Sequence, residues 1–213
     1  MGGKPLEKQD HGKPLVLASG SPRRIELISL LGIPFEVAPS QAEEKATGSG
    51  AERVMALARL KCDDVFARMP DRFVLAADTL VCIDGAVLGK PRDETDAIRM
   101  LRALSGRAHE VHTGVCLRGP NGALEWEAAT TTVIFRALTD DEIKRYAQSG
   151  EPLDKAGAYA IQGRASAFVE RIEGSPTNVV GLPMALVCRM LCRHGLTAAG
   201  IEQNHDASMG TDV

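Results

Sequence analysis

Long hydrophobic runs are absent from this sequence of 213 residues. No apolar stretch reaches the roughly 18 residues that a membrane-spanning helix needs. Residues 1–14 are polar where a secretory signal peptide would be apolar. The sequence therefore predicts a cytoplasmic protein that makes no membrane contact.

Aromatic residues and an excess of positive charge are also missing. Aromatic residues make up 4% of the chain, and 25 Lys and Arg face 28 Asp and Glu, for a formal net charge of −3. A general nucleic-acid binder is expected to present a basic surface and aromatic stacking platforms. We therefore expect no nucleic-acid partner, and any anionic ligand must bind to a local cluster of cations.

Cysteines are few and odd in number, with no C-x-x-C pair. This argues against a disulfide framework and against a zinc site, so reduced thiols in the core are expected. Neither a P-loop nor a G-x-G-x-x-G fingerprint is present, so ATPase and dinucleotide-binding folds lose their main support. The five cysteines are Cys62, Cys82, Cys116, Cys188 and Cys192.

Helical and strand patterns alternate along the chain. Helices are expected at 22–31, 51–69, 94–104, from 140 onward and at 183–192. Strands are expected at 15–18, 35–38, 73–83, 86–88, 109–117, 124–135 and 167–172. The interleaving of helices with hairpins predicts a mixed α/β fold, with a twisted sheet flanked by helices and two lobes around a deep cleft. We expect one domain over 14–196, a flexible N-terminal extension over 1–13 and a flexible tail over 197–213.

The segment from Ala18 to Arg24, with the sequence ASGSPRR, is the strongest local signal. Small residues let the backbone approach a ligand, and the free amides of a first helical turn with two arginines suit phosphate oxygens. Two cations at the positive end of a helix are unfavourable unless an anion offsets them. The alternative is that Ser21 caps the helix while Arg23 and Arg24 are solvated. The segment is a candidate phosphate cradle.

Asp78 interrupts a strand that is otherwise apolar. Burying a carboxylate costs several kcal/mol unless something pairs with it. A metal ion, a lysine or a catalytic water would each explain it, and so would hydrogen bonds to backbone amides near a bend.

Three more charged residues indicate a function only when they are considered together. Lys61 falls on the apolar face of its helix, where it could reach a cleft or merely cover apolar surface. Lys90 follows a hairpin, and Glu44 could hold a cation or be solvated. None of them indicates a function by itself.

A glycine- and proline-punctuated loop spans 151–163 and precedes a strand. Loops of this kind often carry function when a rigid scaffold positions them. Gln162 could read the edge of a base, because its amide offers a donor and an acceptor; a plain connector is the alternative. His109 and His112 are three apart in a strand, so they should face opposite sides and not share a metal.

Taken together, these motifs resemble the Maf family of nucleotide pyrophosphatases over about residues 15–193. The motifs are 19–24, 76–79, 89–91, 104–106, 154–163 and 179–183. The resemblance implies a fold similar to inosine triphosphate pyrophosphatases and a homodimer. It also implies hydrolysis of a nucleoside triphosphate to monophosphate and pyrophosphate with a divalent cation, Mg²⁺ or Mn²⁺.

The resemblance also implies roles for individual residues. The phosphate-binding positions are Ser19, Arg23 and Arg24. The catalytic positions are Asp78, Lys61, Lys90 and Glu44, of which Glu44 and Asp78 are the metal ligands. The positions typical of the branch that acts on dTTP and UTP are Arg24, Thr79 and Gln162. Residues 163–168 and 175–178 receive no role.

Three questions stay open at the level of the sequence. Asp78 could act as a general base or as a metal ligand. The substrate could instead be 7-methyl-GTP or another purine nucleotide. The protein could also be a non-catalytic, nucleotide-sensing regulator of cell division, although such a module has no evident need for a carboxylate in an apolar strand.

Overall fold

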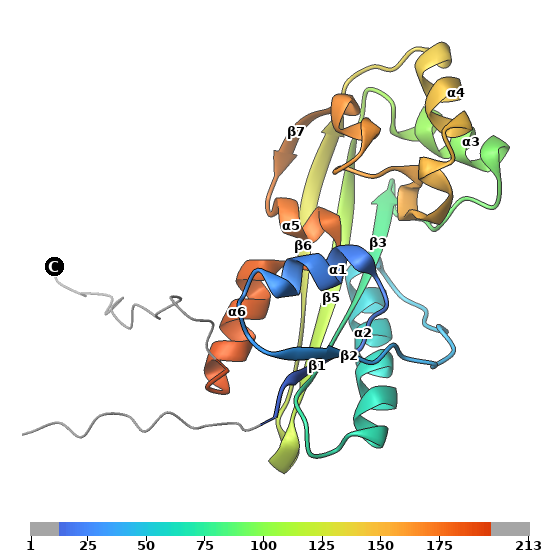
Figure 1. Cartoon of the computed structure of the whole chain (residues 1–213). Helices are drawn as coiled ribbons and strands as arrows, with labels where there is room; N and C mark the ends of the chain where they lie inside the picture. Colours follow the sequence, from blue (N-terminus) through green and yellow to red (C-terminus); the bar gives the residue numbers. More distant parts are fainter. Residues whose placement is uncertain (1–12, 197–213) are drawn as a thin grey trace, which may run out of the picture.

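Three long antiparallel strands form the spine of the molecule in the computed structural model, which describes residues 13–196. The strands are β3 (Val74–Ile83), β5 (Ala108–Arg118) and β6 (Leu124–Phe135). Figure 1 shows them running through both halves of the protein. The extensions predicted to be flexible lie outside the described residues, apart from residue 13.

Four short strands complete a seven-stranded mixed sheet in the order β2-β1-β3-β5-β6-β7, with β4 paired to β3. The first two strands are parallel to their neighbours and the others are antiparallel. This confirms the predicted mixed α/β class. The short strands are β1 (Leu15–Leu17), β2 (Phe35–Val37), β4 (Ala86–Leu88) and β7 (Val169–Glu173).

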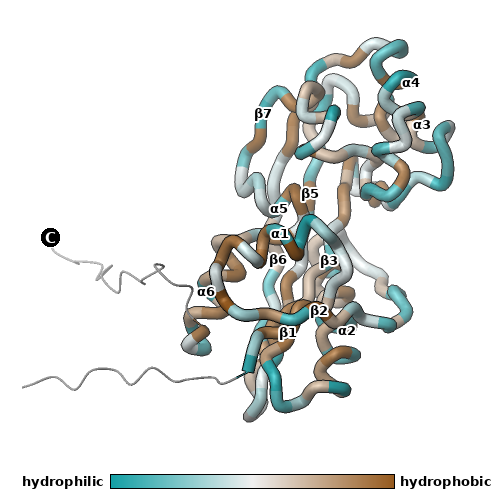
Figure 2. Tube along the Cα trace, in the orientation of Figure 1, coloured by the Kyte–Doolittle hydropathy of each residue, from teal (hydrophilic) through white to brown (hydrophobic). Residues whose placement is uncertain are grey.

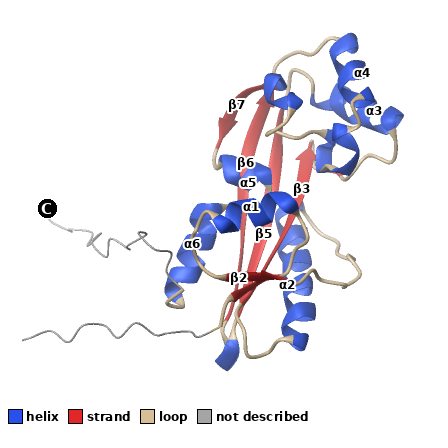
Figure 3. Cartoon of the chain, viewed as in Figure 1, coloured by secondary structure: helices blue, strands red, loops and turns tan. Residues whose placement is uncertain are grey.

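Within residues 13–196, six α-helices pack around the sheet (Figure 3). In the lower lobe of Figure 1, one face of the sheet packs on α2 and the other on α1 and α6. Alternation along β3 explains this division, because Leu75 and Ala77 face α1 and α6 while Val74 and Ala76 face α2. The helices are α1 (Pro22–Ser29), α2 (Gly50–Arg68), α3 (Glu94–Leu104), α4 (Asp140–Gln148), α5 (Pro176–Val180) and α6 (Met184–Arg193).

The upper lobe has its own core, formed where α3, α4 and three 3₁₀ turns between 151 and 168 cover the far ends of β3, β5 and β6. Phe135 packs edge-on against Tyr159 and Phe168 at its centre. Figure 2 shows hydrophobic residues concentrated around β1 and α6, and several hydrophilic residues on the outer helix α4. The sheet therefore carries two lobes with separate cores.

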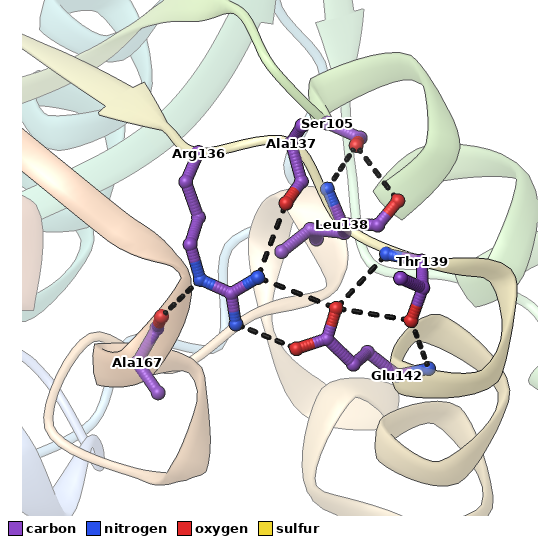
Figure 4. A network of polar contacts seen from close by, with 7 residues as sticks. All are labelled: Ser105, Arg136, Ala137, Leu138, Thr139, Glu142 and Ala167. Atoms are coloured by element: carbon purple, nitrogen blue, oxygen red, sulfur yellow. Dashed lines mark hydrogen bonds and ion pairs between the residues drawn. The ribbon is translucent and has the colours of Figure 1, made fainter.

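A polar network fastens the start of α4 to this upper lobe (Figure 4). Thr139 and Glu142 form a capping box, with the Thr139 amide donating to Glu142 Oε2 at 2.9 Å. Arg136 donates to Glu142 Oε1 at 2.7 Å and to the Ala167 carbonyl at 2.9 Å. The hydrogen bond from Arg136, followed by those from the Thr139 amide and hydroxyl, lowers the pKa of Glu142 to about 2.

Most predicted elements are present with boundaries shifted by one or two residues. The helix at 94–104 and the strands at 86–88 and 124–135 match in full. The first helix ends at Ser29, two residues before the predicted end, and the last strand begins at Val169. The short helix α5 and the 3₁₀ turns were not predicted. All five cysteines are free. No helix within residues 13–196 is both long and apolar enough to cross a membrane.

Candidate active site

A cleft of about 730 Å³ lies between the two lobes. Its walls come from the turn before α1, the segment before α2, one face of α2, the middle of β3, the end of β4 and the loop over 154–162. All nine site residues predicted from the sequence line it. They are Ser19, Arg23, Arg24, Glu44, Lys61, Asp78, Thr79, Lys90 and Gln162.

Lys61 joins two carboxylates on the floor of the cleft. Its Nζ lies 2.6 Å from Asp78 Oδ1 and 2.8 Å from Glu44 Oε1. The Lys61 and Asp78 side chains are 12% and 10% exposed, whereas Glu44 is 58% exposed. The carboxylate in the apolar strand is therefore paired with a lysine, and Lys61 reaches the cleft instead of merely covering apolar surface.

The guanidinium of Arg24 is held by three parts of the fold. Nε donates to the Gly181 carbonyl at 2.8 Å, Nη1 to Ser19 Oγ at 3.2 Å and Nη2 to Thr79 Oγ1 at 3.1 Å. Burial lowers the pKa of Arg24, and the nearby Asp78 carboxylate opposes that shift. Arg24 is thus a fixed cation in the wall of the cleft.

The structure does not support the alternative in which the Ser21 side chain caps α1. Ser21 occupies the N-cap position but its side chain makes no capping hydrogen bond. Its amide instead donates to Ser19 Oγ at 3.3 Å. Ser19 therefore organises the turn, and Arg23 is half-buried at the first turn of α1 in the cleft wall.

The cleft has an excess of positive charge although the whole chain is acidic. Six cationic side chains and three carboxylates line it, which leaves three positive charges. Arg53 and Lys155 are cations that the sequence analysis missed. Arg53 lies on α2 two turns before Lys61, so the same helical period could have marked it. Within residues 13–196 its Nε is buried without a hydrogen-bond partner, whereas Lys155 pairs with Asp154.

The upper wall of the cleft consists of the loop over 154–162 and of Lys90. Gln162 and Lys90 are exposed there. The loop passes close to β3 at Gly157, where φ is +70° and a Cβ would come within 2.9 Å of the Val81 side chain. Tyr159 Oη and His109 Nε2 are 2.9 Å apart in the core beneath it. This wall is therefore anchored to the sheet.

The two histidines point away from each other, as predicted: His109 contacts Tyr159, and His112 contacts Thr130.

The part of the chain that the structure describes holds no group of three His, Cys, Asp or Glu side chains that could bind a metal alone. Asp78 and Glu44 nevertheless converge on a single point, where both meet Lys61. Mg²⁺ typically binds one or two carboxylates and takes its other ligands from substrate phosphates and water. This donor set therefore fits a divalent cation that arrives with a phosphate ligand.

Comparison with known proteins identifies the family. A family described as Maf-like protein matches residues 14–194. The chain belongs to the Maf family. Among curated Maf relatives, the dTTP/UTP pyrophosphatase of Deinococcus radiodurans is 47% identical over 188 residues, covering 88% of this chain and 96% of the relative. The dTTP/UTP pyrophosphatase of Thermococcus gammatolerans is 51% identical over 176 residues, covering 83% and 94%.

Solved structures resemble this Maf family member more remotely. The Staphylococcus aureus Ham1 protein gives a TM-score of 0.39 with 17% identity, covering 58% of this chain and 72% of that chain. A nucleoside-triphosphatase, dITP/XTP pyrophosphatase, from Mycobacterium abscessus gives 0.40 with 16% identity, covering 58% and 74%. Likeness at this level supports no functional conclusion.

Proposed function

We propose that this Maf family member hydrolyses dTTP and UTP to the monophosphate and pyrophosphate. The observation that carries the proposal is the Lys61–Asp78–Glu44 cluster on the floor of a cationic cleft. Two relatives that are 47% and 51% identical to this chain are named dTTP/UTP pyrophosphatase, and the match covers 96% and 94% of their lengths. The cluster combines a carboxylate that can act on water with a lysine that can bind phosphate.

The charge of the cleft suits a nucleoside triphosphate. Hydrolysis of a phosphoanhydride brings water against an anionic chain, so the protein must mainly neutralise charge and position the reactants. Arg23 and the first turn of α1 bind phosphate oxygens from one side, and Lys90 binds them from the upper wall. Ser19 and the remaining N–H groups of Arg24 complete the cradle.

Asp78 is the residue that deprotonates or orients the attacking water. Its pairing with Lys61 fixes the orientation of the carboxylate, because the ammonium holds Oδ1 at 2.6 Å. General-base catalysis requires a carboxylate within hydrogen-bond reach of the water, or one water away. The second function of Lys61 is to neutralise phosphate charge next to the reacting bond.

A divalent cation, Mg²⁺ or Mn²⁺, would be held by Asp78 and Glu44 together with phosphate oxygens and retained waters. When bound, it supplies positive charge to the leaving pyrophosphate. Glu44 is exposed and lies before α2, so its carboxylate can turn from Lys61 toward such an ion.

The pyrimidine base is selected by Thr79, Gln162 and Arg24. Thr79 lies next to Asp78 on β3, while Gln162 faces the cleft from the upper wall. The Gln162 amide can donate to one base atom and accept from another. A purine preference that is insensitive to Gln162→Ala would contradict this assignment and favour 7-methyl-GTP or a related nucleotide.

The decisive experiment is a screen of the purified protein against canonical and modified nucleoside triphosphates, with and without Mg²⁺ or Mn²⁺. Monophosphate and pyrophosphate should appear with dTTP and UTP, and only with the metal. Nucleotide binding without turnover under every condition would instead indicate the nucleotide-sensing regulator.

We also propose that residues 14–196 form one domain of a cytoplasmic protein, and that this protein is a homodimer, as the family resemblance implies. Light scattering coupled to size-exclusion chromatography measures the oligomeric state directly. A monomeric mass across the working concentration range would contradict the dimer.

A further inference from the structure

A chain of hydrogen bonds leads from the cleft into the core of the sheet. Thr79 Oγ1 accepts from Arg24 Nη2 at 3.1 Å and lies 3.0 Å from Thr113 Oγ1 on the neighbouring strand β5. Thr113 Oγ1 in turn donates to the Asn178 carbonyl at 3.1 Å. Thr79 lines the cleft, whereas Thr113 has no exposed surface.

The far end of this chain is firmly fixed. Asn178 is fully buried at the centre of α5. Its side-chain Nδ2 donates to the Val111 carbonyl and to Thr131 Oγ1, both at 2.9 Å. Its backbone N–H donates to Ser175 Oγ at 3.3 Å. The Asn178 carbonyl therefore has a set position against β5, where the Thr113 hydroxyl meets it.

The direction of each proton in the chain follows from chemistry. A carbonyl oxygen can only accept, so the single proton of the Thr113 hydroxyl is directed at Asn178. Thr113 Oγ1 can then only accept from Thr79, which commits the proton of Thr79 to the interior. Arg24 donates to one lone pair of Thr79 Oγ1, and the other lone pair remains for the cleft.

We propose that Thr113 is a positioning residue for substrate selection, because it makes Thr79 an obligate hydrogen-bond acceptor toward the nucleotide base. This inference rests on the proposed function. Uracil and thymine carry an N–H donor at N3, whereas cytosine carries a lone pair there. An acceptor-only Thr79 favours the uracil or thymine edge and disfavours the cytosine edge, where two lone pairs would meet without a proton.

The matched variants are Thr113→Val, which removes the hydroxyl at constant shape, and Thr113→Ser, which retains it. Without the Thr113 hydroxyl, the Thr79 proton is free to turn toward the cleft and donate to N3 of cytosine. We expect Thr113→Val to reduce the ratio of kcat/KM for UTP over CTP by about 3- to 10-fold, the range for one neutral hydrogen bond. Thr113→Ser should restore the wild-type ratio, and Thr132→Val on β6 is the control outside the chain of hydrogen bonds.

A purely structural role would lower turnover of UTP and CTP alike and leave their ratio unchanged. A folded Thr113→Val protein with the wild-type ratio would therefore overturn the inference while leaving the proposed function intact. A wild-type protein that turns over neither dTTP nor UTP would overturn both. Thr113→Ala serves as a second hydroxyl-free variant should the isosteric one fail to fold.

A double-mutant comparison tests whether Thr113 acts through Thr79. In a Thr79→Val background, Thr113→Val should change the UTP/CTP ratio no further, because the hydroxyl that Thr113 orients is gone. Multiplicative effects of the two substitutions on the ratio would show that Thr113 acts by another route and would refute the proposal.

Discussion

Replacing Asp78 by Asn tests the centre of the proposed mechanism. The amide keeps the size of the carboxylate but can neither accept the proton of a water nor carry the charge that a divalent cation needs. Loss of a positioned general base typically costs about 10²- to 10⁴-fold in rate. We expect kcat for dTTP to fall within that range, while binding of the nucleotide stays measurable because the phosphate-binding cations are untouched.

The effect of this substitution on stability is bounded by the geometry. Breaking a buried ion pair by removing one partner costs about 3–5 kcal/mol when the other charge is left uncompensated. Lys61 keeps Glu44 at 2.8 Å, and that carboxylate is more than half exposed. We therefore expect the free energy of unfolding to fall by about 1–3 kcal/mol, which is the cost of one impaired buried polar contact.

The assay is pyrophosphate release from dTTP, with nucleotide affinity measured by calorimetry and stability by urea unfolding. Asp96→Asn is the matched control, because Asp96 is a buried carboxylate on α3 that binds Arg92, just before the helix, and Arg99, and it does not line the cleft. A folded Asp78→Asn enzyme with kcat within tenfold of the wild type would refute the role of Asp78. An equal loss in Asp96→Asn would show that the effect is not specific to the site.

Three further predictions follow from the same structure. Arg24→Lys should lower kcat/KM for dTTP by about 10- to 100-fold, because an ammonium cannot reproduce the guanidinium fork. Arg23→Lys should lower kcat/KM less than tenfold. Equal losses for the two variants in steady-state assays would contradict the special role of the Arg24 guanidinium. Chelation with EDTA should abolish turnover and Mg²⁺ or Mn²⁺ should restore it, so turnover that persists in EDTA would exclude the metal. Burial lowers the pKa of His109 from 6.5 to about 4. Between pH 6.5 and pH 4 the unfolded state therefore binds more protons than the folded state. The free energy of unfolding should fall by about 3 kcal/mol as the pH drops from 6.5 to 4. His109→Phe should remove that part of the pH dependence in urea unfolding, and an unchanged slope would contradict it.

Much of the site was predictable because its residues break local patterns. Asp78 interrupts an apolar strand, and Lys61 occupies an apolar position in a helical repeat. Such violations cost free energy and are retained where a partner or a function compensates for them. Their pairing across 17 residues of sequence was not predictable from either pattern, because the packing of α2 against β3 alone determines it.

The parts that were missed depend on tertiary structure. Thr113 fits the composition of an ordinary strand, and only its place opposite Thr79 and beneath α5 gives it a role. Helix α5 spans five residues, Pro176–Val180, too few for a hydrophobic period to be visible. Arg53 follows the same helical stripe as Lys61, but a long cationic side chain on such a stripe is also typical of a surface position.

The continuity of β5 and β6 through both lobes limits how the cleft can change shape. A rigid-body closure needs a few residues that absorb the rotation, usually in segments between two units. Here the two halves share strands whose ladder pairs run without interruption from Ala108 to Arg118. Closure of the opening as two rigid bodies would therefore have to bend or twist this ladder, whereas the loops at the rim can move without disturbing it.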